Sequence, residues 1–413
     1  MTLGYCVAAR AMLAAMVTVA APAVAETLTL ESAIARALAA TPQQTAAAAR
    51  LDTLRAARAV ADTRPAGSVE VLGENFGFGG RDLNRQIQIG ATYNQPIERG
   101  GKRTARIAVA EGDMAVAASE ALVQRLDLAQ RVQRLHVEVQ AAEAMIALAR
   151  ERVTLADQVV KDATRRVAAA RDPLFVGSQA RTRLAEAQVE LEMAEHARDA
   201  ALARLTALWG SSPAGLAVAA QNFLNVAEVA DGTAAAAADQ AVFAARQQRA
   251  AANETLQRAN GRTDPVWTLG PRYIGTGDAA LVAGITLPFG NRALNRANAD
   301  RARAEARQVD AEAAVADFER RQQILLAAEL VNESAHEVDA IRDKVVPIAQ
   351  RTLTEVRAGY NRGGFTFLDV AAAATALHEA RVRMLRAAAR HHDARATLDR
   401  LTGRFAPLVQ DTQ

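Results

Sequence analysis

The chain has 413 residues, of which 50% are hydrophobic and only 4% are aromatic. This length suits one large or two ordinary domains, and the scarcity of aromatic rings beside abundant alanine favours closely packed helices over a bulky globular core. The formal net charge is +3, with acidic and basic residues interspersed along the chain. No nucleic-acid-binding surface is therefore expected, and nucleic acid is not among the predicted partners.

Residues 1–25 have the features of a cleaved secretory signal. A single positive charge at Arg10 precedes an apolar run, and Ala23 and Ala25 mark a cleavage site. The only cysteine, Cys6, lies inside this segment, so we expect no disulfide, thiol chemistry or lipid-bearing cysteine in the mature chain. No later run reaches about 18 apolar residues, so any entry into a membrane must use strands.

A helix interrupted near Pro42 is predicted for residues 30–64, and two pairs of strand-like segments lie further along the chain. They span residues 69–78 and 86–94, and later about 267–273 and 281–287. Apolar and polar residues alternate in them, least regularly in the first, which places the apolar side chains on one face. Those expected on this face, and expected to contact lipid, are Ile87, Ile89, Tyr93, Trp267, Leu281, Ile285 and Leu287.

Such strands fit either a half-buried soluble sheet or a membrane β-barrel. Because the helices that flank each strand pair are expected to pair with one another, nothing remains to cover the apolar face, and this favours the membrane. Four strands cannot close a barrel, and open sheet edges are not tolerated in lipid. Two chains would supply eight strands and a filled interior, whereas three would supply twelve strands and a lumen. We therefore expect several chains to share one barrel.

Each strand pair leads into a long helix through a junction that contains proline and glycine. The first junction has Pro96, Gly100 and Gly101, and the second, 192 residues later, has Pro288 and Gly290. Proline ends a strand ladder because it has no N–H to donate. Glycine lets the chain turn from a tilted strand into a nearly axial helix.

Between Gly112 and Pro173 the sequence has neither glycine nor proline, and apolar residues recur every three or four positions. This heptad pattern, which runs to Ala170, predicts one helix of roughly 60 residues and about 90 Å. Residues 178–209 continue the spacing, so they are predicted to pack against it as an antiparallel coiled-coil partner. The two shorter helices, 30–64 and 178–209, are expected to line the long one end to end.

The second half of the chain repeats these patterns. Adding 193 to the apolar positions of residues 178–209 gives their equivalents near the C-terminus, and Gly210 becomes Gly403. The polar interruption Arg198 becomes His391, and both are expected in the helix seam, where a lone polar residue specifies register. The second long helix repeats the first at 192 through Ile348, so a one-residue insertion is expected after about Thr352. These offsets predict an internal duplication, residues 26–230 and 231–413, within one domain.

With this order of elements the sequence resembles the TolC-type outer membrane efflux proteins, the exit ducts of tripartite pumps. The most specific segment is AGYNRGGFTFLDV, residues 358–370, which is similar to that family's turn at the periplasmic tip, and LDRLTG ends the return helix. The first-half counterpart is ARDPLFVGSQARTRLAEA, residues 170–187. Its DPLFVGS and the later LTALWG lean towards the heavy-metal resistance branch.

The resemblance implies a mainly α protein that adds a membrane β-barrel to an α-helical tunnel across the periplasm. It implies a homotrimer in the cell outer membrane, in contact with its lipid. Near the tip it implies a periplasmic adaptor (a membrane fusion protein) and an inner membrane pump, for which the RND type is one candidate. The implied function is a passive exit duct for heavy-metal cations or drugs, with no cofactor.

In that family the closed tip involves a tyrosine after the turn's glycine and aspartates on the return helix. Tyr360 and Asp369 match these residues, whereas the second aspartate falls at Ala372, and a basic residue of some members falls at Phe365. A less charged constriction is implied. The residues expected at the tip or gate are Gly359, Tyr360, Gly363, Gly364 and Asp369 in the second half, and Asp172 and Pro173 in the first.

Other polar patterns predict no chemistry. Glu333 and His336 form one Glu-x-x-His, which is half of a di-iron motif and is interpreted as an exposed pair. No catalytic or metal-ligating pattern is found, so neither an enzyme nor a metal site is expected. One alternative function stays open, that of a periplasmic coiled-coil adaptor or scaffold without a barrel. The two separated strand pairs argue against it, because an adaptor needs contiguous short strands and a scaffold needs none.

Overall fold

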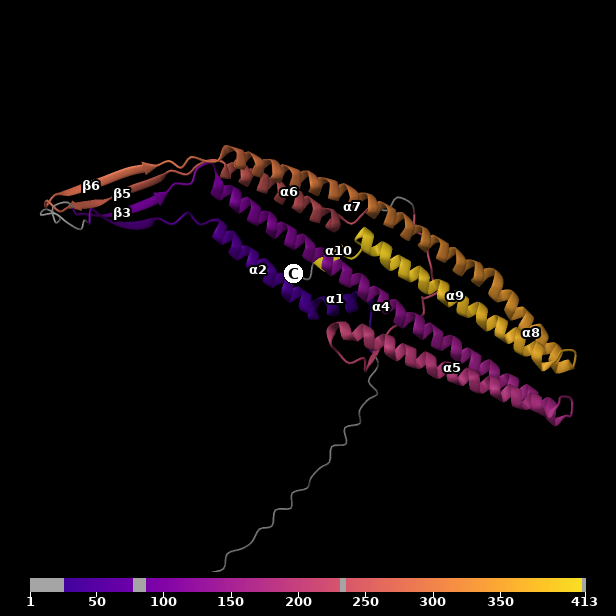
Figure 1. Ribbon diagram of the computed structural model, residues 1–413. Coiled ribbons are helices and arrows are strands. Elements are labelled where there is room, and N and C mark those ends of the chain that lie inside the picture. Colours follow the sequence, from indigo (N-terminus) through magenta and orange to yellow (C-terminus); the bar gives the residue numbers. More distant parts are fainter. Residues whose placement is uncertain (1–25, 77–86, 231–234, 411–413) are drawn as a thin grey trace, which may run out of the picture.

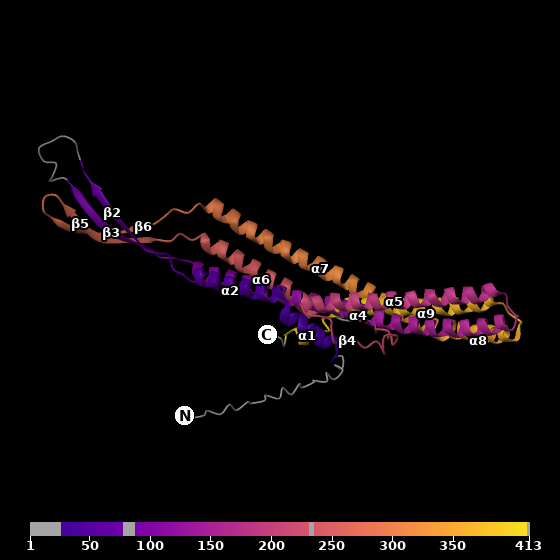
Figure 2. The same cartoon turned by 90° about the horizontal axis from the view of Figure 1, so that it is seen from below.

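The computed structural model describes residues 26–76, 87–230 and 235–410, so the predicted signal segment and Cys6 lie outside the described residues. Helices form a long rod that carries a group of strands at one end, and two helical hairpins end together at the other (Figures 1 and 2). The expected mainly α architecture with long antiparallel helices is confirmed.

The first half starts with β1 (Glu26–Thr27), α1 (Leu30–Ala40) and α2 (Pro42–Ala61), so the helix break predicted near Pro42 lies there. Two strands come before the first long helix, and a return helix follows it. The elements are β2 (Ser68–Glu74), β3 (Gln88–Pro96), α4 (Lys102–Ala168), α5 (Leu174–Thr206), the 3₁₀ turn η1 (Ala207–Trp209) and β4 (Leu216–Ala217).

In the second half two strands again stand between a shorter and a longer helix. Its elements are α6 (Ala237–Asn260), β5 (Val266–Ile274), β6 (Ala279–Thr286), α7 (Arg292–Ala340), the π-helical turn η2 (Ile341–Val345), α8 (Val346–Arg362), α9 (Phe367–Thr402) and α10 (Ala406–Gln410). Within the described ranges, every helix is too short or too polar to cross a membrane.

The four longer strands form one antiparallel sheet in the order β2-β3-β5-β6. The central pairing of β3 with β5 joins the two halves of the chain, and β2 and β6 are the two edges. Strands β1 and β4 form a separate two-residue parallel ladder.

Helix packing follows the predicted scheme around α4. The short helices α1 and α2 lie along its first part and α5 along its last part, so together they line one long helix. Helix α6 packs between α4 and α7, and α9 packs against α7, α8 and α4. Alanines in the seams, such as Ala187 and Ala387, are fully buried and allow the helix axes to approach closely.

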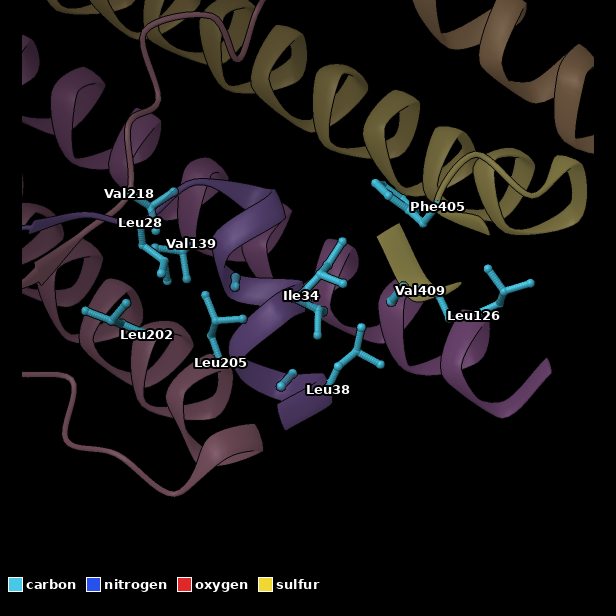
Figure 3. Packing of buried hydrophobic residues seen from close by; sticks show 14 of the residues in the cluster. Leu28, Ile34, Leu38, Leu126, Val139, Leu202, Leu205, Val218, Phe405 and Val409 are labelled. Atoms are coloured by element: carbon cyan, nitrogen blue, oxygen red, sulfur yellow. The ribbon is translucent and has the colours of Figure 1, made fainter. Parts of the chain in front are cut away.

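A cluster of larger apolar side chains lies at mid-rod, where α1 fills the space beside α4 and α5 (Figure 3). Ile34 and Leu38 of α1 face Leu126 of α4 and Leu205 of α5, and all four are at most 3% exposed. Phe405 and Val409 bring the C-terminal end of the chain into the same cluster. This core fixes the level at which the shorter helices meet the longer ones.

Two details of the predicted heptads are wrong. Ala170, expected in the seam, is exposed because α4 ends at Ala168. The extra residue of the second half lies in the π-helical turn Ile341–Val345, not after Thr352. A π-turn accommodates one additional residue in an α-helix. Beyond it Ile348 points outward and is 57% exposed, whereas Leu353, in the register shifted by one, is buried.

Candidate functional site

The sheet has one apolar face, and its register explains why. Tyr93 lies opposite Val69 on one side and Leu269 on the other, and Trp267 lies opposite Ile285. Directly paired residues share a face. The alternation therefore brings the large apolar side chains of four strands together on one surface, where they are 49–74% exposed: Val69, Val71, Ile89, Tyr93, Trp267, Leu269, Tyr273, Leu281 and Ile285.

Two other residues expected on this face lie just outside the strands. Ile87 precedes β3 and is half-buried, with its carbonyl accepting a hydrogen bond from Gly275 N at 2.8 Å. Leu287 follows β6 and is 60% exposed. The opposite face carries polar side chains that bond across strands, since Thr268 Oγ1 donates to Asn94 Oδ1 at 2.6 Å.

At the first junction the proline and the glycines have distinct places. Pro96 is the last residue of β3, and Gly100 and Gly101 both take the left-handed backbone conformation, with φ of 80° and 74°. The turn is held by charges, because Lys102 Nζ lies 2.6 Å from Asp264 Oδ2 and the Arg106 guanidinium pairs with Glu98.

The second junction turns differently. Pro288 follows the end of β6, and Gly290 is not in the left-handed region, contrary to the expected equivalence with the glycines of the first junction. Asn291 caps α7 instead, because its side-chain oxygen accepts a hydrogen bond from Leu294 N at 3.0 Å. A cap supplied by a side chain replaces glycine in setting the chain direction.

The far end of the rod brings together residues that lie almost 200 positions apart in the sequence. Tyr360 at the end of α8 donates from its hydroxyl to Asp172 Oδ2 at 2.5 Å, across the two hairpins. Arg166 of α4 binds both oxygens of Asp172, at 2.9 and 2.8 Å, and donates to the Tyr360 carbonyl oxygen at 2.5 Å. Its guanidinium also lies 4.4 Å from the centre of the Tyr360 ring.

We call Arg166, Asp172 and Tyr360 the tip latch. Tyr360 is 1% exposed, and its burial, together with the hydrogen bond to Asp172, raises the pKa of its hydroxyl. The hydrogen bonds from Arg166 hold the pKa of the Asp172 carboxyl below its ordinary value. At neutral pH the latch therefore contains a protonated phenol between an ionised carboxylate and a guanidinium, and it ties the α4–α5 hairpin to the α8–α9 hairpin.

The remaining tip residues shape the two turns. Gly363 caps α8 with φ of 89°, and Gly364 N donates to the Gly359 carbonyl at 2.9 Å. The Phe365 ring lies against Gly359, where a Cβ would overlap it. In the first hairpin Pro173 is the residue that caps α5.

Asp369 has a local partner. It forms a capping box with Thr366, whose backbone N and Oγ1 both donate to Asp369 Oδ2 at 2.8 Å. The hydrogen bond from the Thr366 backbone lowers the pKa of the Asp369 carboxyl. The carboxylate is nevertheless exposed, so capping leaves its charge at the surface of the tip.

Sequence reasoning singled out Tyr360 and Asp172 but missed Arg166, the residue that binds both. Arg166 belongs to a run of basic residues at the end of a helix, where a solvated side chain is the ordinary outcome. One signal was present. Adding 193 turns Arg166 and Asp172 into Gly359 and Phe365, so a charged pair in one half replaces an apolar contact in the other.

Comparison with known proteins identifies the fold. A model of the family described as outer membrane efflux protein matches residues 33–211. The chain is 27% identical to the cobalt-zinc-cadmium resistance protein CzcC of Cupriavidus metallidurans, over 91% of this chain and 90% of that protein. Residues 33–211 thus match the outer membrane efflux protein family, and the similarity to CzcC extends along nearly the whole chain.

Further comparisons agree. The nickel-cobalt-cadmium resistance protein NccC of Alcaligenes xylosoxydans xylosoxydans is 32% identical, over 35% of this chain and 33% of that protein. The fold matches the structure of CusC with a TM-score of 0.73 and 17% identity, covering 90% of this chain and 91% of that one. It matches VceC from Vibrio cholerae with a TM-score of 0.69 and 17% identity, covering 91% and 96%.

These similarities identify the chain as the outer membrane component of an efflux system, located in the outer membrane and extending into the periplasm. The alternative of a periplasmic adaptor or scaffold is thereby set aside. Glu333 and His336 are exposed on α7, and the described residues contain no cluster of three or more potential metal ligands.

The two polar residues of the helix seams differ in burial. His391 is 4% exposed, its Nδ1 lies 3.1 Å from the Val331 carbonyl oxygen, and burial lowers its pKa. Arg198 lies at the margin of its seam and is only half-buried. It bridges α5 to α4 through Glu143 Oε1 at 3.0 Å. Their role in helix register stays a prediction.

Proposed function

We propose that three copies of this chain form a passive exit duct for heavy-metal cations, fed by a periplasmic adaptor and an inner membrane pump of the RND type. The observation that carries the metal assignment is the similarity to CzcC, a cobalt-zinc-cadmium resistance protein, which spans nearly all of both chains. The second curated relative is also named for resistance to divalent metals. Export of hydrophobic drugs is the competing cargo assignment.

The sheet supports the shared twelve-stranded barrel. Its apolar face has no covering element among the described residues, and lipid is the solvent that such a face requires. Neighbouring strands are antiparallel throughout, so β2 and β6 run in opposite directions. Strand β6 of one chain can therefore pair with β2 of the next and continue the same antiparallel pattern around a closed ring.

The tip latch supports a gate at the periplasmic end. It connects the two hairpins of one chain, so breaking it frees them to move apart, and three latches in a trimer would surround the entrance. Asp369, exposed near the same end, would add a ring of three carboxylates, which attract cations and repel anions. Such a ring fits a cation cargo better than a neutral drug.

Deleting the gene and comparing growth tests the cargo. We expect sensitivity to cobalt, zinc, cadmium and nickel to rise and sensitivity to hydrophobic drugs to stay unchanged, with the wild-type gene restoring resistance. Raised drug sensitivity with unchanged metal sensitivity would overturn the assignment of metal cations as the cargo, but it would agree with the proposal that the protein is an exit duct.

A matched pair of variants tests the barrel. Ile285 belongs to the apolar face and Thr286 to the other, so Ile285→Arg should cost about 2–4 kcal/mol in lipid whereas Thr286→Arg costs little. Native mass measurement in detergent should give a trimer for the wild type and for Thr286→Arg. A stable wild-type monomer, or equal assembly of both variants, would contradict the shared barrel.

A further inference from the structure

Where the sheet meets the helices, four chain segments are bonded together at one level (Figures 1 and 2). Arg106 at the start of α4 donates to the carbonyl oxygens of Ala61, the last residue of α2, and of Thr63, at 3.3 and 3.0 Å. Asn295 of α7 donates to the carbonyl oxygen of Gly261 beyond α6 at 3.4 Å. We call the four segments, residues 61–65, 97–106, 261–265 and 287–296, the collar.

The collar is strongly basic. It contains eight basic and three acidic residues, which gives 8 − 3 = +5, while the whole chain carries only +3. All three acids are already neutralised, because Asp62, Glu98 and Asp264 pair with Arg103, Arg106 and Lys102. Five exposed arginines remain, for whose guanidinium groups the described part of the chain supplies no ion pair: Arg64, Arg99, Arg262, Arg292 and Arg296.

Two of these charges destabilise the start of the helix that carries them. Arg292 begins α7, whose first turn has no acidic residue, although the positive end of the helix dipole favours acids there. Arg296 follows one turn later, and like charges at this spacing repel. An anionic partner outside the chain would offset both effects.

Exposed apolar side chains lie among these arginines. Phe289 is fully exposed, and Leu287 and Leu294 are 60% and 55% exposed. Their segment continues directly from the apolar face of the sheet. A surface that combines free guanidinium groups with apolar side chains at the end of a lipid-facing sheet matches the boundary between phosphate headgroups and acyl chains.

We propose that the collar binds anionic phospholipid headgroups of the periplasmic leaflet, with the arginines on the phosphates and the apolar side chains among the upper acyl carbons. Part of this rests on the proposed function, namely that the apolar face of the sheet lies in lipid. The binding fixes the depth at which the rod stands in the membrane.

The two tryptophans provide a local probe. Trp267 lies on β5 two residues after the collar, whereas Trp209 lies in η1 beyond the end of α5. In a Trp209→Phe background, quenching of Trp267 by brominated phospholipid measures which lipid occupies the adjacent positions. Brominated zwitterionic and brominated anionic phospholipid are compared in otherwise identical bilayers.

We expect the anionic lipid to be preferred next to Trp267 by about fivefold, the factor that one basic residue near an anionic surface supplies. The preference should disappear in the triple variant Arg99→Gln, Arg292→Gln, Arg296→Gln. It should also disappear at about 1 M salt, where the Debye length falls to about 3 Å. The matched control, Arg131→Gln, Arg362→Gln, Arg386→Gln, removes three exposed and equally unpaired charges elsewhere on the rod and should keep it.

Equal quenching by the two lipids in the wild type, or an unchanged preference in the collar variant, would overturn the proposal. Quenching by the zwitterionic lipid keeps the test decisive, because it reports insertion alone. A variant that loses the anionic preference but keeps this quenching is inserted. If the wild type showed no quenching by either lipid, the lipid-facing sheet itself would be wrong, so failure of the barrel and failure of the collar are distinguishable.

Discussion

The two hairpin tips share one backbone design but are closed by different chemistry. In both, the outgoing helix ends with the same turn hydrogen bond: Arg171 N donates to the Arg166 carbonyl oxygen at 2.9 Å in the first tip, and Gly364 N donates to the Gly359 carbonyl oxygen at 2.9 Å in the second. These positions are 193 residues apart in the sequence. The return helices are capped at equivalent residues too, Pro173 and Thr366.

The side chains on this common backbone differ. Where the second tip has the contact of Phe365 with Gly359, the first tip has the ion pair of Asp172 with Arg166. The apolar contact of Phe365 with Gly359 offers no hydrogen-bond acceptor. A carboxylate that is already paired with arginine can still accept a further hydrogen bond, and Asp172 accepts one from the Tyr360 hydroxyl. The first tip therefore binds the second through Asp172 and Tyr360, whereas the turn of the second tip is packed by its own Phe365. These equivalences support the proposed duplication and show where its two copies have specialised.

The largest effect is expected from removing Asp172. Asp172→Ala abolishes three hydrogen bonds and leaves the Arg166 guanidinium and the buried Tyr360 hydroxyl without their acceptor, which should cost the tip about 2–4 kcal/mol. Hydrogen exchange should rise in both hairpin ends and channel conductance should increase. Removal of the equivalent side chain by Phe365→Ala is the control and should raise exchange in the second tip alone. Equal local effects of the two variants would contradict the asymmetry of the tips.

Acid should break the same contact. Because the folded pKa of Asp172 is lowered, its hydrogen bonds contribute fully above the ordinary aspartate pKa of about 4 and are lost as the pH falls through the lowered value. Conductance of the wild type should therefore rise with acidification below about pH 4. The Asp172→Asn channel should lack this step, and a step of the same size in that variant would assign the titration to another group.

The turn residues should respond with opposite signs. Ala170 and Gly363 occupy equivalent positions and are both left-handed, with φ of 52° and 89°. A residue with a Cβ is strained there by roughly 1 kcal/mol. Ala170→Gly should raise the thermal stability of the first hairpin, and Gly363→Ala should lower that of the second. The same sign for both exchanges would show that the two turns are not equivalent.

The smallest change in stability is expected at Asp369, whose exposed carboxylate makes only local cap bonds. Asp369→Asn keeps an oxygen that can cap the helix but removes the charge. Single-channel recordings should show reduced cation selectivity and loss of block by trivalent cations from the periplasmic side, with assembly intact. Unchanged selectivity together with lowered stability would leave Asp369 as a helix cap only.

Periodic features of this molecule could be predicted from the sequence, whereas contacts between individual side chains could not. Strand alternation identified residues such as Tyr93 and Ile285 as members of one face, because side chains alternate between the two faces of a sheet whichever strand lies next to them. The heptads identified the helix partners but misplaced the extra residue of the second half. A π-turn cannot be recognised in a sequence whose apolar residues are spaced by three and four. The structure reveals it, because the buried residue after the turn is Leu353, in the register shifted by one.

The contacts at the tip could not be predicted from the sequence. Tyr360 and Asp172 are 188 residues apart, and nothing local in either segment requires their contact. Arg166 was overlooked because a basic residue in the last turn of a helix already has a sufficient local explanation. Only the fold, which brings both hairpins to one level, assigns it two partners.

The unlike edges of the sheet also decide how such a protein assembles. A chain with β2 on one edge and β6 on the other can add copies only head to tail in the proposed ring, and a two-chain intermediate leaves as many open edges as a single chain. The last edge is satisfied only when the third copy joins, so partial rings gain little and closure is cooperative. An unassembled chain therefore exposes both an open strand edge and an apolar face, the two features that favour aggregation.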